Sequence, residues 1–389
     1  MNIISHKAIK LMTKPIKVLQ LQPKYNVRTS DPKEEIINTL SGNEFDVTAA
    51  FLTGTPEQSE MLSVCKKIKC FNFSKKELKG LRLQVIFQLW KYCREQQFDV
   101  IITHRFKPLY IILIVNKLLS KPSQCISVIR ANGNFARVYR RLITYLFTDK
   151  HWKYVGVSES VKNDLLQYNN AGFTTQNVTY INNSIDIEKT LSGLLPKSSA
   201  REKLGLDSNA FVFGTIGRLV TIKGHFYLLD AFKQILITTP SAQLVIIGGG
   251  ELEEKMRDYI QKNKMETSII LTGNIPDAYR FLRALDVFIL TSLTEAFGLV
   301  LLEAMVAKIP IIATDVGGIK DVISNKGKLI PPASIESLVA SMTEHLQLNK
   351  QQLQSLGEEL YKRAEEHFSV KHYREQFLHL IKSFHQQQH

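Results

Sequence analysis

The chain has 389 residues, 44% of them hydrophobic and 22% charged, which favours two domains of about 150 to 200 residues and excludes long disorder, collagen repeats and a membrane-embedded bundle. Its net charge of +14 is concentrated: residues 1–190 hold 28 Lys and Arg against 15 Asp and Glu, whereas residues 191–389 hold 22 against 21. The basic half predicts a partner with phosphate or carboxylate groups, which is nucleic acid, an anionic membrane surface or an acidic substrate, unless the charge serves solubility alone.

Six short β-branched runs in the first half alternate with longer amphipathic segments, the pattern of βαβ units that build parallel sheets with helices on both faces. The expected strands are 16–21, 45–51, 98–103, 126–131, 154–158 and 178–183. The most apolar stretch, Leu109 to Leu119, is too short to span a bilayer, which takes about 20 residues. No signal peptide is visible at the N-terminus, so we expect a cytosolic chain, with attachment to a membrane surface left open.

The four cysteines of the chain all lie in this first half. Cys65, Cys70, Cys93 and Cys125 form no CxxC pair, and none has a histidine at zinc-finger spacing. We therefore expect buried free thiols, no structural metal and a reducing compartment.

A polar stretch over residues 191–209 suits a linker with a short helix, and a second strand series follows it. Its members are 211–217, 242–249, 268–273, 287–292, 310–314 and 328–332. The chain after Pro332 carries apolar residues at helical spacing. We expect an α/β fold of two doubly wound domains, 1–190 and 191–365, facing each other across a ligand cleft, with residues 366–389 as a final helix.

The densest group of candidate site residues is VFILTSLTEAFGLVLLEAM, a strand, a polar loop and a helix that opens near Phe297. The first N–H groups of a helix lack internal partners, so the amides of Phe297, Gly298 and Leu299 can hold a diphosphate. Glu295 precedes the helix and Glu303 lies one turn inside it, where a carboxylate can accept two ribose hydroxyls. Two such glutamates alone also fit a dipole partner and a surface residue.

Cations and glycines follow three other strands of this series. Arg218 and Lys223 lie on one strand-to-helix loop, where a planar fork and a compact charge together can grip a diphosphate. Gly249 belongs to a glycine run that permits close approach of a ligand but does not satisfy GxGxxG. Asn274 and Ile275, at the next strand end, offer main-chain groups to a nucleobase.

Taken in order, these segments resemble the retaining glycosyltransferases of family 4, which have the GT-B architecture. The resemblance runs through GRLVTIKG, GGGELEEKM, TGNIPD, ALDVFILTSLTEAFGLVLLEAM and IIATDVGGIKDVI, and more loosely through VGVSESVKNDL and INNSIDIE. It implies that residues 1–190 bind the acceptor, that residues 191–365 bind the nucleotide sugar, and that the final helix, 366–389, crosses back onto the first domain. It also implies that Arg218 and Lys223 bind the donor diphosphate without a metal. It also implies that Glu295 and Glu303 form the family's E-x7-E motif, with Glu295 on the transferred sugar and Glu303 on the ribose.

The first half departs from the family pattern in two places. QLQPKYNVRTS lacks the usual glycines, so contacts on that side are expected from Asn26, Arg28 or Thr29. The family's usual histidine is absent from IRANGNFAR, which leaves His104, at a strand's carboxyl end, as the candidate catalytic histidine, although a structural histidine fits equally well.

The resulting prediction is a hexosyltransferase that moves sugar from a nucleotide diphosphate donor, UDP-linked by family habit, to a hydroxyl of an envelope glycan of lipopolysaccharide or capsule type. Its partners would be the donor, a glycan or lipid-linked acceptor, and an anionic inner membrane face bound by the basic half. The alternatives are a sugar-nucleotide epimerase or an inverting transferase of the same architecture. A nucleic-acid binder has little support, because aromatic residues rarely interleave the lysine clusters.

Overall fold

The computed structural model describes residues 14–27, 31–58 and 62–386 of the chain. By their internal contacts these residues divide into two compact units. The first unit draws on Met1–Ser127, Phe147–Trp152 and Phe377–His389, and the second on Val128–Leu146 and Lys153–Gln376. The predicted domain boundaries at 190/191 and 365/366 stay predictions, as does the cleft. Arg28 and Thr29 lie outside the described residues.

The first sheet has seven strands in the order β3-β2-β1-β4-β5-β6-β7. Their bounds are β1 Ile16–Gln22, β2 Phe45–Phe51, β3 Lys67–Cys70, β4 Val100–His104, β5 Gln124–Ile129, β6 Trp152–Gly156 and β7 Val178–Tyr180. The pairs β1–β2, β1–β4, β2–β3 and β6–β7 are parallel. This order reverses direction between β1 and β4, as in doubly wound folds.

One strand of this sheet, β3, was not predicted, because its sequence KIKC alternates lysines with apolar residues and resembles a basic surface cluster. It is an edge strand that pairs with β2, from Thr48 opposite Lys67 to Phe51 opposite Cys70. Charged side chains on an edge strand discourage pairing with other chains.

The helices of the first half connect these strands. They are α1 Pro32–Thr39, α2 Leu83–Gln96, α3 Phe106–Leu118, α4 Val138–Phe147, α5 Glu159–Leu166 and α6 Ile187–Gly193, with short 3-10 turns η1 Pro56–Gln58 and η2 Asn169–Ala171. The apolar stretch around Leu109 is α3, a largely buried helix. The described residues contain no helix both long and apolar enough to cross a membrane. The cysteines are free thiols, buried at Cys65, Cys93 and Cys125 and half-buried at Cys70.

The second sheet has six parallel strands in the order β10-β9-β8-β11-β12-β13. Their bounds are β8 Val212–Ile216, β9 Gln243–Ile247, β10 Ile269–Gly273, β11 Val287–Leu290, β12 Ile311–Thr314 and β13 Lys328–Ile330. All six strands lie within a few residues of the ranges that the sequence predicts. The direction of the chain reverses between β8 and β11, which places the topological switch point at their carboxyl ends.

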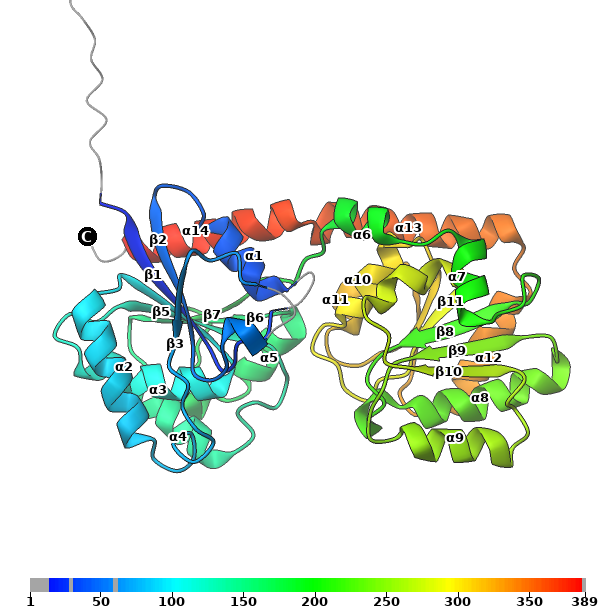
Figure 1. Ribbon diagram of the computed structural model, residues 1–389, viewed down its shortest axis with the longest axis horizontal. Helices are drawn as coiled ribbons and strands as arrows, with labels where there is room; N and C mark the ends of the chain where they lie inside the picture. The colour runs from blue at the N-terminus through cyan, green and yellow to red at the C-terminus, as the bar shows by residue number, and fades with distance from the viewer. Residues whose placement is uncertain (1–13, 28–30, 59–61, 387–389) are drawn as a thin grey trace, which may run out of the picture. The chain divides into compact units, whose positions relative to one another are not determined.

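Helices cover both faces of this sheet (Figure 1). They are α7 Lys197–Leu204, α8 His225–Thr238, α9 Glu253–Lys262, α10 Leu299–Val306, α11 Ile319–Ile323, α12 Ile335–Leu346 and α13 Lys350–Phe368, with 3-10 turns η3 Thr221–Lys223 and η4 Ala278–Ala284. On the face of α8, α9 and α12 the core includes Phe232, Met256 and Met342 against Phe213 and Ile246 of the strands.

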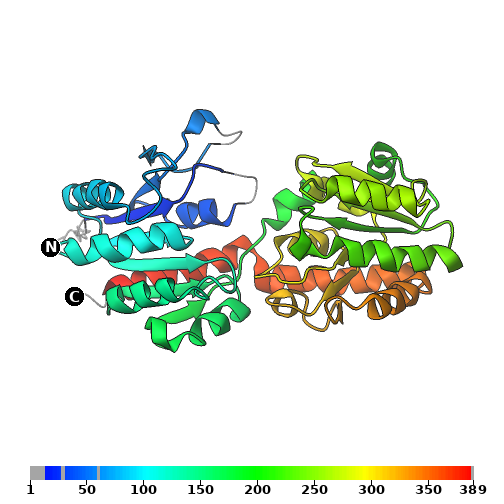
Figure 2. The same ribbon diagram turned by 90° about the horizontal axis from the view of Figure 1, so that it is seen from below.

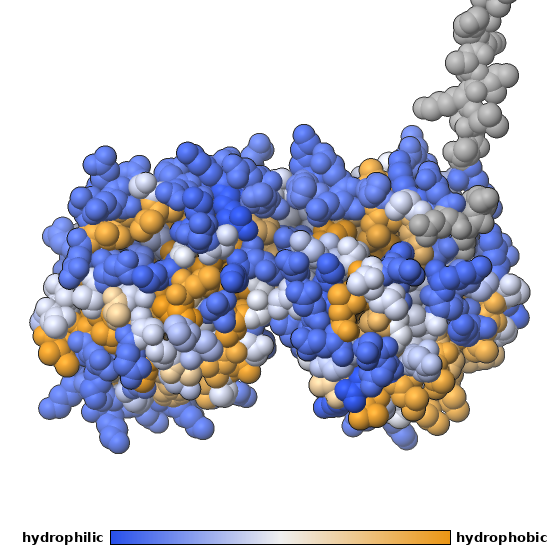
Figure 3. Space-filling view, turned by 180° about the vertical axis from the view of Figure 1, so that it is seen from behind, coloured by the Kyte–Doolittle hydropathy of each residue, from blue (hydrophilic) through white to orange (hydrophobic). Residues whose placement is uncertain are grey.

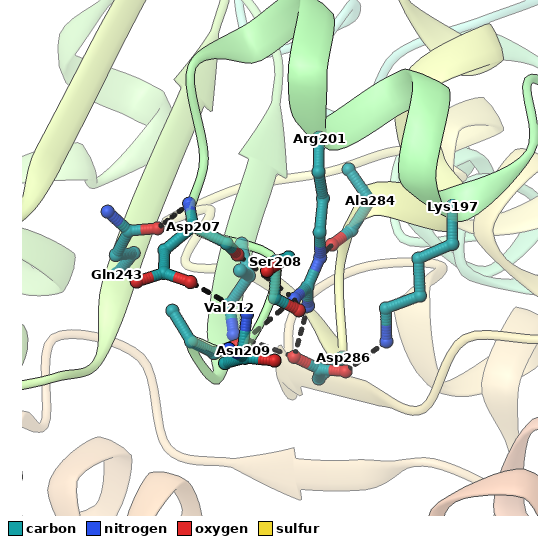
Figure 4. A network of polar contacts seen from close by, with 10 residues as sticks. Lys197, Arg201, Asp207, Ser208, Asn209, Val212, Gln243, Ala284 and Asp286 are labelled. Atoms are coloured by element: carbon teal, nitrogen blue, oxygen red, sulfur yellow. Dashed lines mark hydrogen bonds and ion pairs between the residues drawn. The ribbon is translucent and has the colours of Figure 1, made fainter.

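A buried arginine fixes the amino ends of β8 and β11, at the opposite edge of the sheet from the switch point. Arg201, on α7, donates to the carbonyl of Ala284 at 3.0 Å and to the Asp286 carboxylate at 2.8 Å (Figure 4). The same Asp286 oxygen accepts from the Val212 N–H at 2.7 Å, and Lys197 pairs with the other oxygen. This network holds the two central strands in register.

The final helix, α14 Val370–Gln386, ends in the first unit. Phe377, Ile381 and Phe384 are buried, and Lys382 forms an ion pair with Glu44 at 2.5 Å. Figure 2 shows this end of the helix, in red, beside the elements of the first sheet.

Candidate functional site

Two loops meet at the switch point of the second sheet, one after β8 and one after β11. The first contains Arg218 and Lys223, and the second contains Glu295. The Leu293 N–H donates to the carbonyl of Ile222 at 2.8 Å, and the Thr291 hydroxyl donates to the carbonyl of Lys223 at 3.0 Å. The structure therefore brings the predicted cations and the predicted first glutamate onto adjoining backbone.

The Lys223 ammonium forms an ion pair with the Glu295 carboxylate. The two side chains are only 16% and 17% exposed, so the pair is partly shielded from water and from salt. Arg218, in contrast, is exposed on the same loop. A diphosphate bound here would contact the exposed guanidinium of Arg218 and the ammonium of Lys223, which is already paired with Glu295.

Glycines let these loops approach each other. Gly224 has φ +65°, and a Cβ added to it would lie 2.1 Å from the carbonyl oxygen of Thr291. Gly317, after β12, has φ +55°, and its Cβ would lie 1.8 Å from the carbonyl oxygen of Glu295. The next N–H, that of Gly318, donates to this same oxygen at 3.0 Å. The backbone of Glu295 thus packs against Gly317 and Gly318. The sequence did not predict this role for the two glycines.

The glycine run after β9 forms backbone contacts with both neighbouring loops. The Leu219 N–H donates to the carbonyl of Gly249 at 3.0 Å, and the Gly248 N–H donates to the carbonyl of Gly273 at 2.9 Å. A Cβ on Gly249 would lie 3.5 Å from the Cβ of Asn274. The structure therefore brings Gly249 and Asn274 together, with Ile275 half-buried beside them.

The helix predicted to open near Phe297 begins at Leu299, with Gly298 as its N-cap at φ +85°. The Phe297 side chain is 2% exposed and packs edge-on against Phe368, with ring centroids 5.8 Å apart. Phe297 therefore serves the core through its ring, and only its backbone N–H is suited to a ligand. Leu299 is 40% exposed.

Glu303 lies in the second turn of α10. Enclosure of the carboxyl by protein raises its pKa to about 7, and the nearby Asp277 carboxylate contributes to the rise. Burial raises the pKa of Tyr279, and the charges of Asp277 and Glu303 add to the rise. At neutral pH the carboxyl is thus close to half ionised, and a hydroxyl-rich ligand that favours the carboxylate would complete its ionisation.

One further residue of the site, His225, was not predicted from the sequence. It follows Gly224 directly, is 2% exposed, and places its Nε2 3.1 Å from the carbonyl oxygen of Arg218. Burial lowers its pKa, so the ring is neutral and Nε2 acts as a donor to that carbonyl. His225 thereby fixes the backbone that carries Arg218.

His104 ends β4, at the switch point of the first sheet, and is 1% exposed. The next residue, Arg105, has φ +66° and ψ +167°, a conformation that side chains other than glycine rarely adopt. Asn26, on the loop after β1, accepts from the Lys33 ammonium through its carbonyl at 3.3 Å. His104 and Asn26 belong to the first unit and the candidates for the donor site to the second, so the catalytic role of His104 stays a prediction.

Two family models match the chain. Residues 196–364 match glycosyl transferases group 1, and residues 34–189 match glycosyltransferase family 4. An uncharacterised glycosyltransferase of Methanocaldococcus jannaschii is 24% identical over 60% of this chain and 59% of its own length. An Escherichia coli enzyme, UDP-Gal:alpha-D-GlcNAc-diphosphoundecaprenol alpha-1,3-galactosyltransferase, is 26% identical over 80% of each chain. The solved structure of Anabaena HepE with UDP-glucose has a TM-score of 0.75 at 19% identity, covering 95% of this chain and all of that one, which shows the shared fold.

Proposed function

The chain belongs to the glycosyltransferases of group 1 and family 4, and from that membership we propose that it transfers a hexose-type sugar from a nucleotide diphosphate donor to a hydroxyl of an envelope glycan, with retention of configuration. The observation that carries the proposal is the meeting of Arg218, Lys223 and Glu295 on two adjoining loops at the switch point of the second sheet.

The donor diphosphate binds where positive charge and exposed peptide dipoles converge. Arg218 donates two hydrogen bonds to one phosphate, and the Lys223 ammonium leaves Glu295 and pairs with the other phosphate. The N–H groups of Gly298 and Leu299, at the start of α10, add further donors. As the sugar–phosphate bond breaks, negative charge grows on the leaving diphosphate, and these donors stabilise it without a metal.

The rest of the donor follows the surrounding loops. Glu303 accepts hydrogen bonds from the ribose hydroxyls, and the base lies against Gly249, Asn274 and Ile275. The base is proposed to be uracil, in keeping with the UDP-glucose bound by the structurally similar HepE.

Sugar transfer itself involves the leaving phosphate. The acceptor hydroxyl attacks the anomeric carbon from the face that the diphosphate leaves, and a phosphate oxygen accepts the hydroxyl proton as the old bond breaks. Glu295, freed from Lys223, contacts the transferred sugar. His104 is proposed as an additional group on the acceptor side.

The acceptor is proposed to be a lipid-linked glycan on the cytoplasmic side of the membrane. The Escherichia coli relative carries a diphosphoundecaprenol acceptor in its name, and the first half of this chain is strongly basic. Such an acceptor would bring the catalytic fold to a membrane surface.

Calorimetry with UDP-, GDP- and ADP-linked hexoses tests the donor site. We expect one class to bind, and we expect Arg218→Ala with Lys223→Ala to weaken binding by at least about a hundredfold, since charge-assisted bonds contribute about 1.5–3 kcal/mol each. Lys326→Ala with Lys328→Ala removes equal charge from exposed ion pairs and should leave binding unchanged. No binding of any nucleotide sugar would refute the proposal, and an inverted anomeric product would refute retention.

A further inference from the structure

Large apolar side chains are exposed on one helix that no part of the proposed chemistry uses. Val138, Leu142, Tyr145 and Leu146 of α4 are 69%, 55%, 59% and 60% exposed. Figure 3, seen from behind, shows apolar residues gathered at the lower right, the side to which the half-turn brings α4 of Figure 1. A contiguous exposed patch of this kind marks an interaction surface rather than ordinary surface scatter.

The four side chains form one stripe along the helix. Their spacing of four, three and one residues places them on a single face, while Thr144 is buried on the other side. An ordinary amphipathic helix buries its apolar face and shows its polar face to water. Helix α4 does the reverse, so its apolar stripe is built to meet something outside the chain.

The charge around this stripe has one sign. Arg137, Arg140 and Arg141 flank it, and residues 131–147 contain no Asp or Glu. The Arg140 guanidinium donates to the carbonyl of Asn134 at 2.7 Å, and that of Arg141 lies over the Tyr168 ring, so both are held close to the helix. The three guanidinium groups keep their positive charge in these contacts, so they attract phosphate.

This charge pattern discriminates between occupants. A second copy of the chain seated on the same face would bring arginines against arginines. An anionic bilayer complements the patch on both counts, because acyl chains accept the apolar stripe and phosphate groups accept the arginines.

We propose that α4 binds in the plane of an anionic membrane, with its four apolar side chains among the acyl chains and its three arginines at the phosphates. This inference rests on the proposed function, because a lipid-linked acceptor is located at the membrane surface. Binding would then depend on insertion of the four apolar side chains into the bilayer, and not only on attraction between a basic surface and anionic lipids.

Flotation with vesicles tests it, using equimolar phosphatidylglycerol and phosphatidylcholine against pure phosphatidylcholine. We expect binding to the anionic vesicles only, and Leu142→Glu with Leu146→Glu should weaken it at least about tenfold. Each arginine changed to glutamine should weaken it about fivefold. Ile237→Glu, on α8, alters a side chain that is 78% exposed outside the patch and should have no effect.

Fluorescence shows whether the stripe enters the bilayer. The wild type, whose tryptophans are Trp90 and Trp152, is the reference. The emission that Tyr145→Trp adds to it should shift to shorter wavelength with anionic vesicles and be quenched by brominated acyl chains. Equal binding to neutral vesicles, retained binding by the double glutamate variant, or an introduced indole that stays unquenched would overturn the proposal. A wild-type protein that is dimeric, with a double glutamate variant that is monomeric, would also overturn the proposal, because a second copy of the chain would then cover the stripe. Every variant should bind the nucleotide sugar in solution as the wild type does. A wild type that binds no nucleotide sugar would contradict the proposed function and would not bear on membrane binding.

Discussion

The Lys223 ammonium pairs with the Glu295 carboxylate, and this contact joins the loop after β8 to the loop after β11. The cation proposed for the donor diphosphate is therefore occupied by the carboxylate proposed for the transferred sugar. In the proposed mechanism, donor binding exchanges one partner of Lys223 for another, and the same exchange frees Glu295.

Glu295→Gln separates these two roles. Removing the carboxylate charge frees Lys223 for phosphate, so we expect UDP to bind several-fold more tightly, while turnover falls at least about a hundredfold because the contact to the sugar is lost. Calorimetry with UDP and steady-state kinetics measure the two effects. Glu344→Gln, which breaks the exposed pair with Lys328, is the control. Weaker UDP binding by Glu295→Gln would show that Glu295 positions the lysine rather than competing for it.

A second prediction concerns Gly317, which lies against the carbonyl oxygen of Glu295. Gly317→Ala would place a methyl group 1.8 Å from the Glu295 carbonyl oxygen, so the loop must move. We expect turnover to fall at least about tenfold, since small misplacements of a catalytic group are costly. Gly205→Ala is the matched control, because its φ of +70° imposes similar backbone strain and nothing lies within 4 Å of the new methyl. If both variants lose the same activity, backbone strain and not loop displacement is responsible.

The sequence predicted these loops but not what supports them. Arg218, Lys223 and Glu295 stand out because charged residues at strand ends are visible in a single sequence. Gly317 and His225 act through backbone contacts to residues 22 and 7 positions away, which no local pattern reveals. Buried strands were predicted because their apolar runs are continuous, whereas the edge strand β3 was missed because its lysines face solvent.

The raised pKa of Glu303 predicts that donor binding depends on pH. In the proposed site the ionised carboxylate accepts the ribose hydroxyls, so affinity for UDP-glucose should rise about tenfold from pH 6 to pH 8, with a midpoint near the pKa of about 7. Glu303→Gln should abolish this dependence. Asp277→Asn should move the midpoint to lower pH, because the Asp277 charge helps to raise the pKa; asparagine also tolerates the left-handed backbone there. An unshifted midpoint in Asp277→Asn would contradict this electrostatic coupling.

Glu303 should also affect stability, with a sign opposite to that of a paired carboxylate. Its pKa in the folded chain lies above the unfolded value of 4.5, so the carboxyl costs stability as it ionises between about pH 4.5 and pH 7. Glu303→Gln should therefore raise the free energy of unfolding by about 1–3 kcal/mol at pH 8 and change it little at pH 4. Denaturant unfolding at the two pH values measures this difference, and an equal effect at both would show that the carboxyl ionises at its ordinary pKa.

The end of α14 should stabilise the first unit specifically. Ile381 is fully buried there, and Ile381→Ala should cost about 2–5 kcal/mol by lost burial and the cavity left behind. The two tryptophans of the chain, Trp90 and Trp152, both belong to this unit, so tryptophan fluorescence reports its unfolding. Lys382→Ala, which breaks only the exposed pair with Glu44, should cost at most about 1 kcal/mol. An unchanged fluorescence transition in Ile381→Ala would mean that α14 contributes nothing to the first unit's core.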